Sequence, residues 1–167
     1  MQYRIGLRKL SIQDANQLYM IYADEEVSKY RGSNAMKSIK DALIFIQNDE
    51  RIEGEVLTIR QGVELLKENK IIGSVMIRMN KKNEYEIGYS IGRKFWRQGF
   101  GTEIIKLLLK KTQENKEIEN VVAWCHMDNT ASIKILKKNK FCLVVNNLTK
   151  KNYPYLKYLN KTTGNKV

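Results

Sequence analysis

The sequence contains few of the residues that several common kinds of functional site require. Its 167 residues include one histidine and two cysteines, Cys125 and Cys142, and no second Cys or His lies at metal-ligand spacing from either cysteine. The single histidine, His126, forms no Ser/His/Asp pattern by spacing. The sequence therefore disfavours metal-dependent hydrolysis and triad chemistry. Both cysteines lie in apolar runs, so we expect buried, reduced thiols.

Long apolar runs, prolines and linker sequences are scarce as well. No apolar run approaches the roughly 20 residues that a membrane-spanning helix needs, and the first four residues carry charge without the apolar block of a secretory signal. With 43% hydrophobic residues, 29% charged residues and one proline, the composition is typical of a globular protein. We expect one cytoplasmic domain over residues 1–159 and a polar, frayed tail at 160–167.

The charge of the chain is strongly positive. The sequence has 30 Lys and Arg residues against 18 Asp and Glu residues, a formal net charge of +12. Such a charge favours anionic partners in general: nucleic acid, a membrane surface or phosphorylated small molecules. The lysines are spread along the chain without a dense block, which is typical of a solvated surface. The charge alone does not choose between these partners.

Hydrophobic periodicity predicts helices and strands joined by short connections. Tyr3, Ile5 and Leu7 alternate with other residues as in a half-buried strand, and Ser11 with Asp14 forms a capping pair before a helical pattern. The expected helices cover residues 12–23, 38–51, 99–115 and 130–139, with a short helical turn inside the loop at 24–37. The expected strands cover residues 3–8, 56–66, 71–79, 85–91, 121–125, 141–147 and 153–159. Short turns join the strands between 56 and 91, so we predict an antiparallel meander there.

A glycine-bearing turn before the third long helix is the most informative local pattern. Gly99 and Gly101 open this helix, directly after a basic loop with Arg93, Lys94 and Arg97. Amides at a helix N-terminus are unpaired, and glycine lets an anion such as a pyrophosphate approach the backbone closely. A plain tight turn is the alternative interpretation.

Two well-known phosphate motifs do not fit this turn. A dinucleotide fingerprint needs a third glycine where the chain has Ile104, and a P-loop needs Gly-Lys-Ser/Thr at the helix start. Three other sequence motifs occur together: EIGY at 86–89, FWRQGFGTE at 95–103 and NTASIKIL at 129–136, followed by Phe141. Two predicted helices, a strand meander and the segment Ile72-Gly73-Ser74 precede these motifs. In these motifs and in this order of elements, the chain resembles the GNAT superfamily of N-acetyltransferases, particularly its RimJ/RimL-like branch.

The resemblance implies an α/β fold with a splayed, mixed, largely antiparallel sheet flanked by helices, and acetyl-CoA, the acyl donor, between the two middle strands. Backbone amides of residues 98–102 would hold the pyrophosphate, and the strand edge at 89–91 would bind the pantetheine. The cofactor-binding residues implied are Tyr89, Ser90, Ile91, Arg97, Gln98, Gly99, Phe100, Gly101, Thr102, Asn129 and Ser132.

The implied reaction is direct attack of an amine on the thioester, which requires a group that removes the amine's proton. Glu86 is the first candidate for this base, acting through water, and Glu84 is the second; a solvent-facing glutamate is the alternative. Ser132 matches a serine that contacts the cofactor arm or helps protonate the departing thiolate, although it also fits a helix surface. Asn129 fits both a cofactor contact and the N-cap of the following helix.

Three residues depart from the family pattern. Leu136 stands where many members have a tyrosine that acts as general acid, Trp96 replaces the usual Gln or Arg before the turn, and Lys140 replaces a glycine. The general acid therefore stays open, and direct release of the thiolate is an alternative. Four aromatic residues belong either to an acceptor pocket or to the core: Tyr19, Tyr22, Tyr30 and Trp124. Segments 31–37 and 148–153 are expected to shape acceptor specificity.

The sequence thus predicts an acetyl-CoA-dependent N-acetyltransferase that acts on a primary amine of a protein N-terminus, an amino acid or a small molecule. We expect a monomer or homodimer without a membrane partner. The alternatives are a basic RNA- or ribosome-binding module and a non-catalytic acyl-CoA-binding protein. Nucleic acid is the less favoured partner because no RNA-reading motif is present.

Overall fold

The computed structural model describes residues 3–79, 84–114, 118, 120–150 and 153–161. Helices and strands follow one another in nearly the predicted order. Their bounds are β1 Ile5–Arg8, η1 Ile12–Asp14, α1 Ala15–Tyr22, α2 Glu25–Ser28, α3 Ile39–Gln47, β2 Glu50–Glu53, β3 Val56–Leu65, β4 Lys70–Met79, β5 Glu84–Ile91, η2 Arg93–Phe95, α4 Phe100–Gln113, β6 Asn120–His126, α5 Thr130–Lys138, β7 Cys142–Lys150 and β8 Tyr153–Lys161.

The strands form one eight-stranded sheet in the order β1-β3-β4-β5-β6-β8-β7, and β2 also pairs with β3. Every pair is antiparallel except β5 with β6, which run parallel. The predicted meander of β3, β4 and β5 is confirmed, as is the mixed, largely antiparallel sheet flanked by helices. A parallel pair needs a long crossover, and α4 supplies it between β5 and β6.

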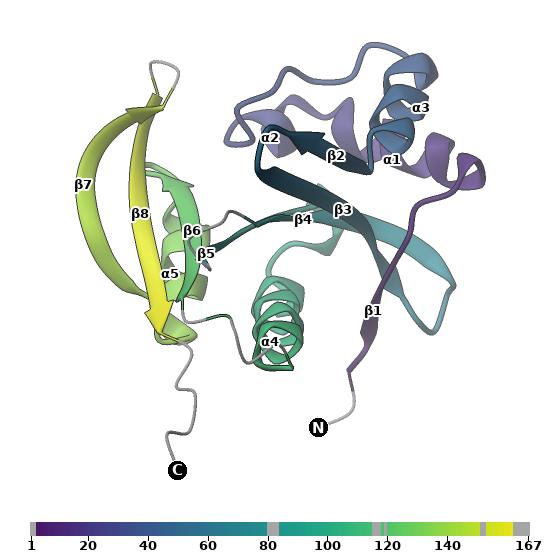
Figure 1. Cartoon of the computed structure of the whole chain (residues 1–167). Coiled ribbons are helices and arrows are strands. Elements are labelled where there is room, and N and C mark those ends of the chain that lie inside the picture. Colours follow the sequence, from purple (N-terminus) through teal and green to yellow (C-terminus); the bar gives the residue numbers. More distant parts are fainter. Residues whose placement is uncertain (1–2, 80–83, 115–117, 119, 151–152, 162–167) are drawn as a thin grey trace.

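Helices cover both faces of the sheet (Figure 1). On one face lie α1, α2 and α3, where the Tyr22 hydroxyl is 2.6 Å from Ser74 Oγ of β4. On the other face lies α4, whose Phe100 and Ile104 belong to the same buried cluster as Ile87 of β5. Since side chains alternate along a strand, each strand of the meander presents one set of side chains to each helical layer.

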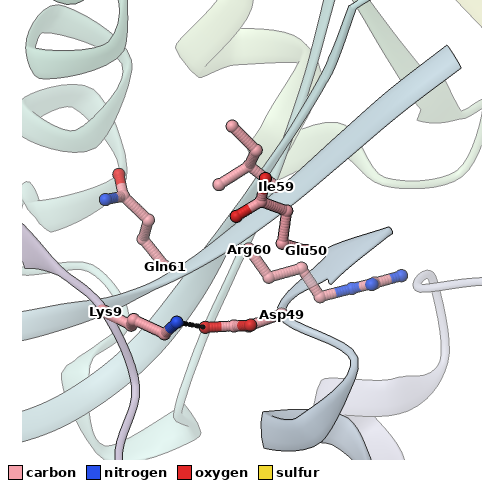
Figure 2. Close-up of a pocket in the computed structure, with 6 residues that line it drawn as sticks. All are labelled: Lys9, Asp49, Glu50, Ile59, Arg60 and Gln61. Carbon is pink, nitrogen blue, oxygen red and sulfur yellow. Dashed lines mark ion pairs between the residues drawn. The ribbon is translucent and has the colours of Figure 1, made fainter. Parts of the chain in front are cut away.

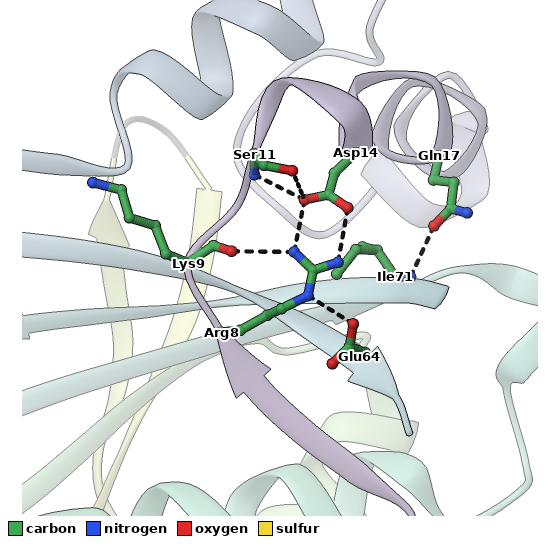
Figure 3. A network of polar contacts seen from close by, with 7 residues as sticks. All are labelled: Arg8, Lys9, Ser11, Asp14, Gln17, Glu64 and Ile71. Atoms are coloured by element: carbon green, nitrogen blue, oxygen red, sulfur yellow. Dashed lines mark hydrogen bonds and ion pairs between the residues drawn. The ribbon is translucent and has the colours of Figure 1, made fainter. Parts of the chain in front are cut away.

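A partly buried ionic network joins the first strand to the first helical turn (Figure 3). The Arg8 guanidinium donates to both carboxylate oxygens of Asp14, at 2.8 Å each, and to Glu64 at 2.7 Å. The backbone amide of Ser11 also donates to Asp14, at 2.8 Å, which confirms the predicted capping pair. Bidentate pairing of this kind fixes geometry as well as charge. The network therefore holds β1, η1 and β3 in register.

Asp14 makes the stability of the fold dependent on pH. Burial alone favours its neutral form, but hydrogen bonds from Arg8 and Ser11 outweigh burial and lower the pKa of Asp14. Its stabilising contribution is present above the unfolded-state pKa of about 3.9 and is lost as pH falls through the folded-state value. We expect Asp14→Asn to lower the free energy of unfolding at pH 7 by about 2 kcal/mol. Urea titrations at pH 7 and pH 3 should show the difference from the wild type shrinking at pH 3; an equal difference at both values would contradict this role.

Two sequence predictions about the fold are wrong. The helix expected at 38–51 ends at Gln47, because Asn48 caps it by donating its side-chain amide to the Ile44 carbonyl at 2.7 Å. Residues Glu50–Glu53 instead form β2, paired with β3. Cys125 is buried and reduced as expected, but Cys142 is exposed, because it lies near the start of the edge strand β7.

The remaining boundaries differ from expectation by a few residues. Strand β8 continues through Asn160 and Lys161, past the expected start of the tail, and residues 162–167 lie outside the described part of the chain. None of the helices that the structure describes combines the length and the apolar composition needed to span a bilayer. Within the same described ranges, no cluster of three or more His, Cys, Asp or Glu residues is placed to hold a metal ion.

Candidate functional site

The parallel strands β5 and β6 separate halfway along their length. Their register runs from Glu84 opposite Asn120 to Ile87 opposite Ala123 and stops there. Beyond that point, residues 88–91 stay paired with β4, whereas residues 124–126 stay paired with β8. The two facing backbone edges therefore offer amide and carbonyl groups that do not bond to each other. An extended ligand can use such groups as an additional strand would.

The turn before α4 lies directly after β5 and has an unusual backbone. Gly99 has φ +86°, and Arg97 also has a positive φ, of 62°. The first helical hydrogen bond of α4 runs from the Glu103 amide to the Gly99 carbonyl at 3.2 Å. The amides of Phe100, Gly101 and Thr102 consequently have no acceptor within the helix. Free amides at the positive end of a 14-residue helix suit an anionic group.

Arg4 and Glu103 stabilise this turn through hydrogen bonds. The sequence analysis did not identify either residue as part of the site. The buried Glu103 carboxylate accepts from the backbone amides of Arg4 and Ile5 and, at 3.0 Å, from the Arg4 guanidinium. Arg4 also donates to the Gln98 carbonyl at 3.0 Å and lies 4.2 Å from the Phe100 ring centre. Arg4, the residue directly before β1, therefore stabilises the loop that presents the free amides. The positions are 99 residues apart, so no local spacing could reveal the pair.

Helix α5 approaches the same region closely. A Cβ on Gly101 would lie 2.7 Å from Ile135 Cδ1 and 3.4 Å from the Tyr89 ring, so only glycine fits there without a shift. The Tyr89 hydroxyl lies 3.3 Å from Ser132 Oγ. Burial raises the pKa of Tyr89 to about 12, so its hydroxyl is protonated at neutral pH. The structure thus brings together three predicted site residues, Tyr89, Gly101 and Ser132.

The structure confirms the N-cap interpretation of Asn129. Its side-chain oxygen accepts the Ser132 amide at 3.1 Å and caps α5. Leu136, at the position of the missing tyrosine, is 1% exposed and packs in the main core. Trp96 donates its indole N–H to the Ile91 carbonyl at 2.7 Å and so occupies the last carbonyl of β5. In the structure these three residues therefore have structural roles: one caps a helix, one packs in the core and one bonds to the end of a strand.

Glu86 lies on the opposite face of the sheet from Tyr89. It occurs one residue before β5 and β6 separate, and its Oε2 is 3.4 Å from Arg78 Nη1. Ser90, the third residue after the last β5–β6 pair, pairs with Ser74, which contacts Tyr22 of α1. Glu84 lies in the paired half of β5, with its Oε1 2.8 Å from Lys157 Nζ. The two candidate bases therefore have different surroundings.

The four aromatic residues considered for an acceptor pocket do not form one group. Tyr22 is fully buried in the α1–α3 core, and Tyr19 packs against that core. Tyr30 instead lies 5.2 Å from the His126 ring, and Lys157 lies 5.7 Å from the ring of Trp124. Of the expected specificity segments, residues 31–37 border α2 and α3, whereas residues 151–152 lie outside the described ranges.

Comparisons with known proteins agree with this geometry. The model of the family described as "Acetyltransferase (GNAT) domain" matches residues 4–142. The chain is 31% identical over 140 residues to an uncharacterized N-acetyltransferase of Bacillus subtilis (strain 168), YoaA, covering 83% of this chain and 79% of the relative.

Solved structures share the fold. RimL, described as a ribosomal alpha-N-protein acetyltransferase, superposes with a TM-score of 0.77 at 16% identity over 96% of this chain and 91% of RimL. Spermidine N-acetyltransferase from Vibrio cholerae, in complex with CoA and spermine, superposes with a TM-score of 0.75 at 14% identity over 95% of each chain. At these identities the structural likeness establishes the fold.

Proposed function

The chain belongs to the GNAT acetyltransferase family and is an acyltransferase, and from this premise we propose that it moves the acetyl group of acetyl-CoA to a primary amine by direct attack. The observation that carries the proposal is the separation of β5 from β6 beside the free amides that open α4. A strand edge followed by an anion-binding helix terminus matches a ligand with an extended amide-bearing arm and a pyrophosphate.

The residues present fit such a donor. The Gly99–Thr102 backbone would hold the pyrophosphate, with Arg97 and Gln98 exposed beside it, and the edge of residues 89–91 would bind the amide-bearing arm. The left-handed conformation at Arg97 costs roughly 1 kcal/mol, and strain of this kind is common where a backbone is shaped for a ligand. When bound, acetyl-CoA supplies an acetyl group already activated as a thioester.

Glu86 is the proposed base. A protonated amine is not nucleophilic, so a base must take its proton directly or through water, and a carboxylate can do so. Glu86 lies one residue before the last β5–β6 pair, on the face that carries α1–α3, and its side chain is 20% exposed, so water can reach it. Arg78 holds the carboxylate in place from the neighbouring strand.

Ser132 and Tyr89 are proposed to act together on the leaving group. Their hydroxyls are 3.3 Å apart on the α4–α5 face, next to Gly101. A tyrosine with a pKa of about 12 is too weak an acid to protonate a thiolate, whose conjugate acid has a pKa of about 8.5. We infer that Tyr89 orients Ser132, and that Ser132 donates a hydrogen bond to the departing sulfur. Glu86 takes the first proton that the amine nitrogen loses, and the thiolate takes the second, which leaves the nitrogen as its new bond to the acetyl carbon forms and the C–S bond breaks.

Donor binding can be tested by thermal unfolding with acetyl-CoA, CoA, NAD or ATP added separately. A ligand that binds only the folded state raises its stability by about 2.7 kcal/mol at a hundred times its Kd. We expect acetyl-CoA and CoA to raise Tm and NAD to leave it unchanged. A thiol-release assay with a panel of amines then tests turnover. Donor binding without turnover would favour a non-catalytic acyl-CoA-binding protein, and no response to either CoA species would remove the enzyme proposal.

A further inference from the structure

A cavity of about 310 Å³ lies on the α1–α3 side of the sheet. Three arginines line it from three elements: Arg31 after α2, Arg51 of β2 and Arg60 of β3. Figure 2 shows the Arg60 side chain directed away from Lys9 and Gln61, which line a smaller neighbouring cavity. Arg60 lines both cavities.

Two of these arginines are held by aromatic rings and by neutral groups. The Arg31 guanidinium lies 3.6 Å from the ring centre of Tyr22, and that of Arg60 lies 5.5 Å from the ring centre of Phe45. Arg60 also donates to the Asn48 carbonyl at 2.8 Å. Within the described residues neither guanidinium has a carboxylate within 4.0 Å, whereas Arg51 pairs with Glu53 at 2.6 Å. Burial lowers the pKa of Arg31, and burial together with the neighbouring arginines lowers that of Arg60.

One carboxylate lines the cavity, but it has another role. Asp41 accepts hydrogen bonds from the backbone amides of Lys37 at 2.7 Å and Ser38 at 3.0 Å, and it closes the first turn of α3. Half-buried cations with few counter-charges are costly unless an anion binds them. The cavity therefore combines planar, bidentate donors with an excess of positive charge, which is the chemistry that recognises a carboxylate.

Sheet register connects this cavity to the proposed base. Arg60 is opposite Met76, and Met76 is opposite Gly88, the first residue after β5 and β6 separate. The next row contains Thr58, Arg78 and Glu86. Opposed residues share a face, and neighbouring strands are about 4.8 Å apart, so Arg60 and Gly88 are about 10 Å apart in the sheet. In these two rows Glu86 is the only carboxylate.

Arg31 is anchored to the same face through Tyr22. The Tyr22 hydroxyl bonds to Ser74, which is opposite Ser90 on β5. Arg31, through Tyr22 and Ser74, and Arg60, through the sheet register, therefore have defined positions relative to the half of β5 that has separated from β6.

Resting on the proposed function, we propose that Arg31 and Arg60 bind a carboxylate of the acceptor, so that the preferred substrate is an amine that also carries an acidic group. The carboxylate occupies the cavity while the amine reaches Glu86. Polycationic amines are disfavoured, because Arg31, Arg60 and Arg78 repel them. In this respect the acceptor differs from the spermine held by the structural neighbour from Vibrio cholerae.

Matched amines test this specificity. One arm uses amidated peptides Ala-Xaa-Gly-Gly with Asp, Asn or Lys as the second residue, and the other compares β-alanine with its amide. A charge-assisted hydrogen bond contributes about 1.5–3 kcal/mol, so we expect kcat/KM to be roughly 10- to 100-fold higher for the acidic member of a pair. A preference confined to one arm identifies whether the acceptor is a peptide or a small molecule.

Variants connect the preference to the cavity. Arg60→Gln should remove most of the acidic preference, Arg60→Glu should favour the Lys peptide, and Arg31→Gln should resemble Arg60→Gln. Lys110→Gln removes one positive charge from an exposed site on α4, on the other face of the sheet, and should leave the preference unchanged.

A binding measurement separates this inference from the proposed function. The Asp peptide, labelled at its C-terminus, is titrated with the wild type and with Arg60→Gln in the presence of CoA, and its fluorescence anisotropy is followed. Tighter binding to the wild type supports the acidic acceptor even without turnover. Acetylation with equal or opposite charge preference overturns the inference and leaves the transferase proposal standing, and equal binding to both proteins in the absence of turnover overturns it as well.

Discussion

Replacing Glu86 with glutamine is expected to lower kcat/KM for an acetylated amine by about 100- to 10,000-fold, the usual contribution of a positioned general base. Glutamine has nearly the same shape and keeps a polar contact with Arg78, but it cannot take a proton from an ammonium group. The loss should fall on kcat, because Glu86 is not part of the strand edge or the glycine turn that are proposed to bind the donor. The acetyl-CoA-dependent rise in Tm should therefore stay as in the wild type.

Glu84→Gln is the matched variant for this experiment. Glu84 is on the same strand and two residues earlier, but its carboxylate is bound by Lys157 at 2.8 Å, and it pairs with Asn120 at the far end of the β5–β6 register from the separation. Its kcat/KM is expected to stay within about fivefold of the wild type, as for an ionic pair worth up to about 1 kcal/mol. If Glu84→Gln removes activity and Glu86→Gln does not, the roles of the two glutamates are reversed.

Features that depend on neighbouring residues could be predicted from the sequence. The Ser11–Asp14 capping pair, the meander from β3 to β5 and the glycine turn before α4 are all found as expected. Each follows from residue types within one turn or one strand, where spacing and geometry are directly related. The glycines and the helix N-terminus of the candidate site could be located from the sequence for the same reason, because they are local features.

Features that depend on distant contacts could not be predicted in this way. Strand β2 is exposed at all four residues, so no alternation of buried and exposed positions marks it, and its pairing with β3 determines its conformation. Arg4 reaches Glu103, and Tyr89 reaches Ser132, only after the chain folds. The same is true of Arg31 and Arg60, which look like ordinary surface charges in the sequence but share one cavity in the structure.

Gly73→Ala is expected to destabilise the fold by about 3 kcal/mol, the upper end of the usual cost of overpacking. A Cβ at this position would lie 2.1 Å from the Ser90 carbonyl oxygen and 3.0 Å from Ile91 Cα. Both are backbone atoms, so no side-chain rotation can relieve the contact. Strand β5 must move away from β4, although Gly73 is opposite Ile91 and the Gly92 amide donates to Ile72 at 2.8 Å. Urea unfolding of the variant measures this cost.

The same displacement should weaken donor binding, because Ser90 and Ile91 form the strand edge proposed to bind the amide-bearing arm. Gly88→Ala is the matched control for stability: its Cβ would meet only the Met76 side chain, at 3.5 Å from Cε and 3.9 Å from Cβ. These are ordinary contacts with a flexible side chain, and the expected cost is below about 1 kcal/mol. If Gly73→Ala folds at low temperature, its acetyl-CoA-dependent rise in Tm should be absent. A folded Gly73→Ala protein that binds acetyl-CoA as tightly as the wild type would show that the edge of β5 does not hold the donor, because a shifted strand cannot keep the same hydrogen bonds to it.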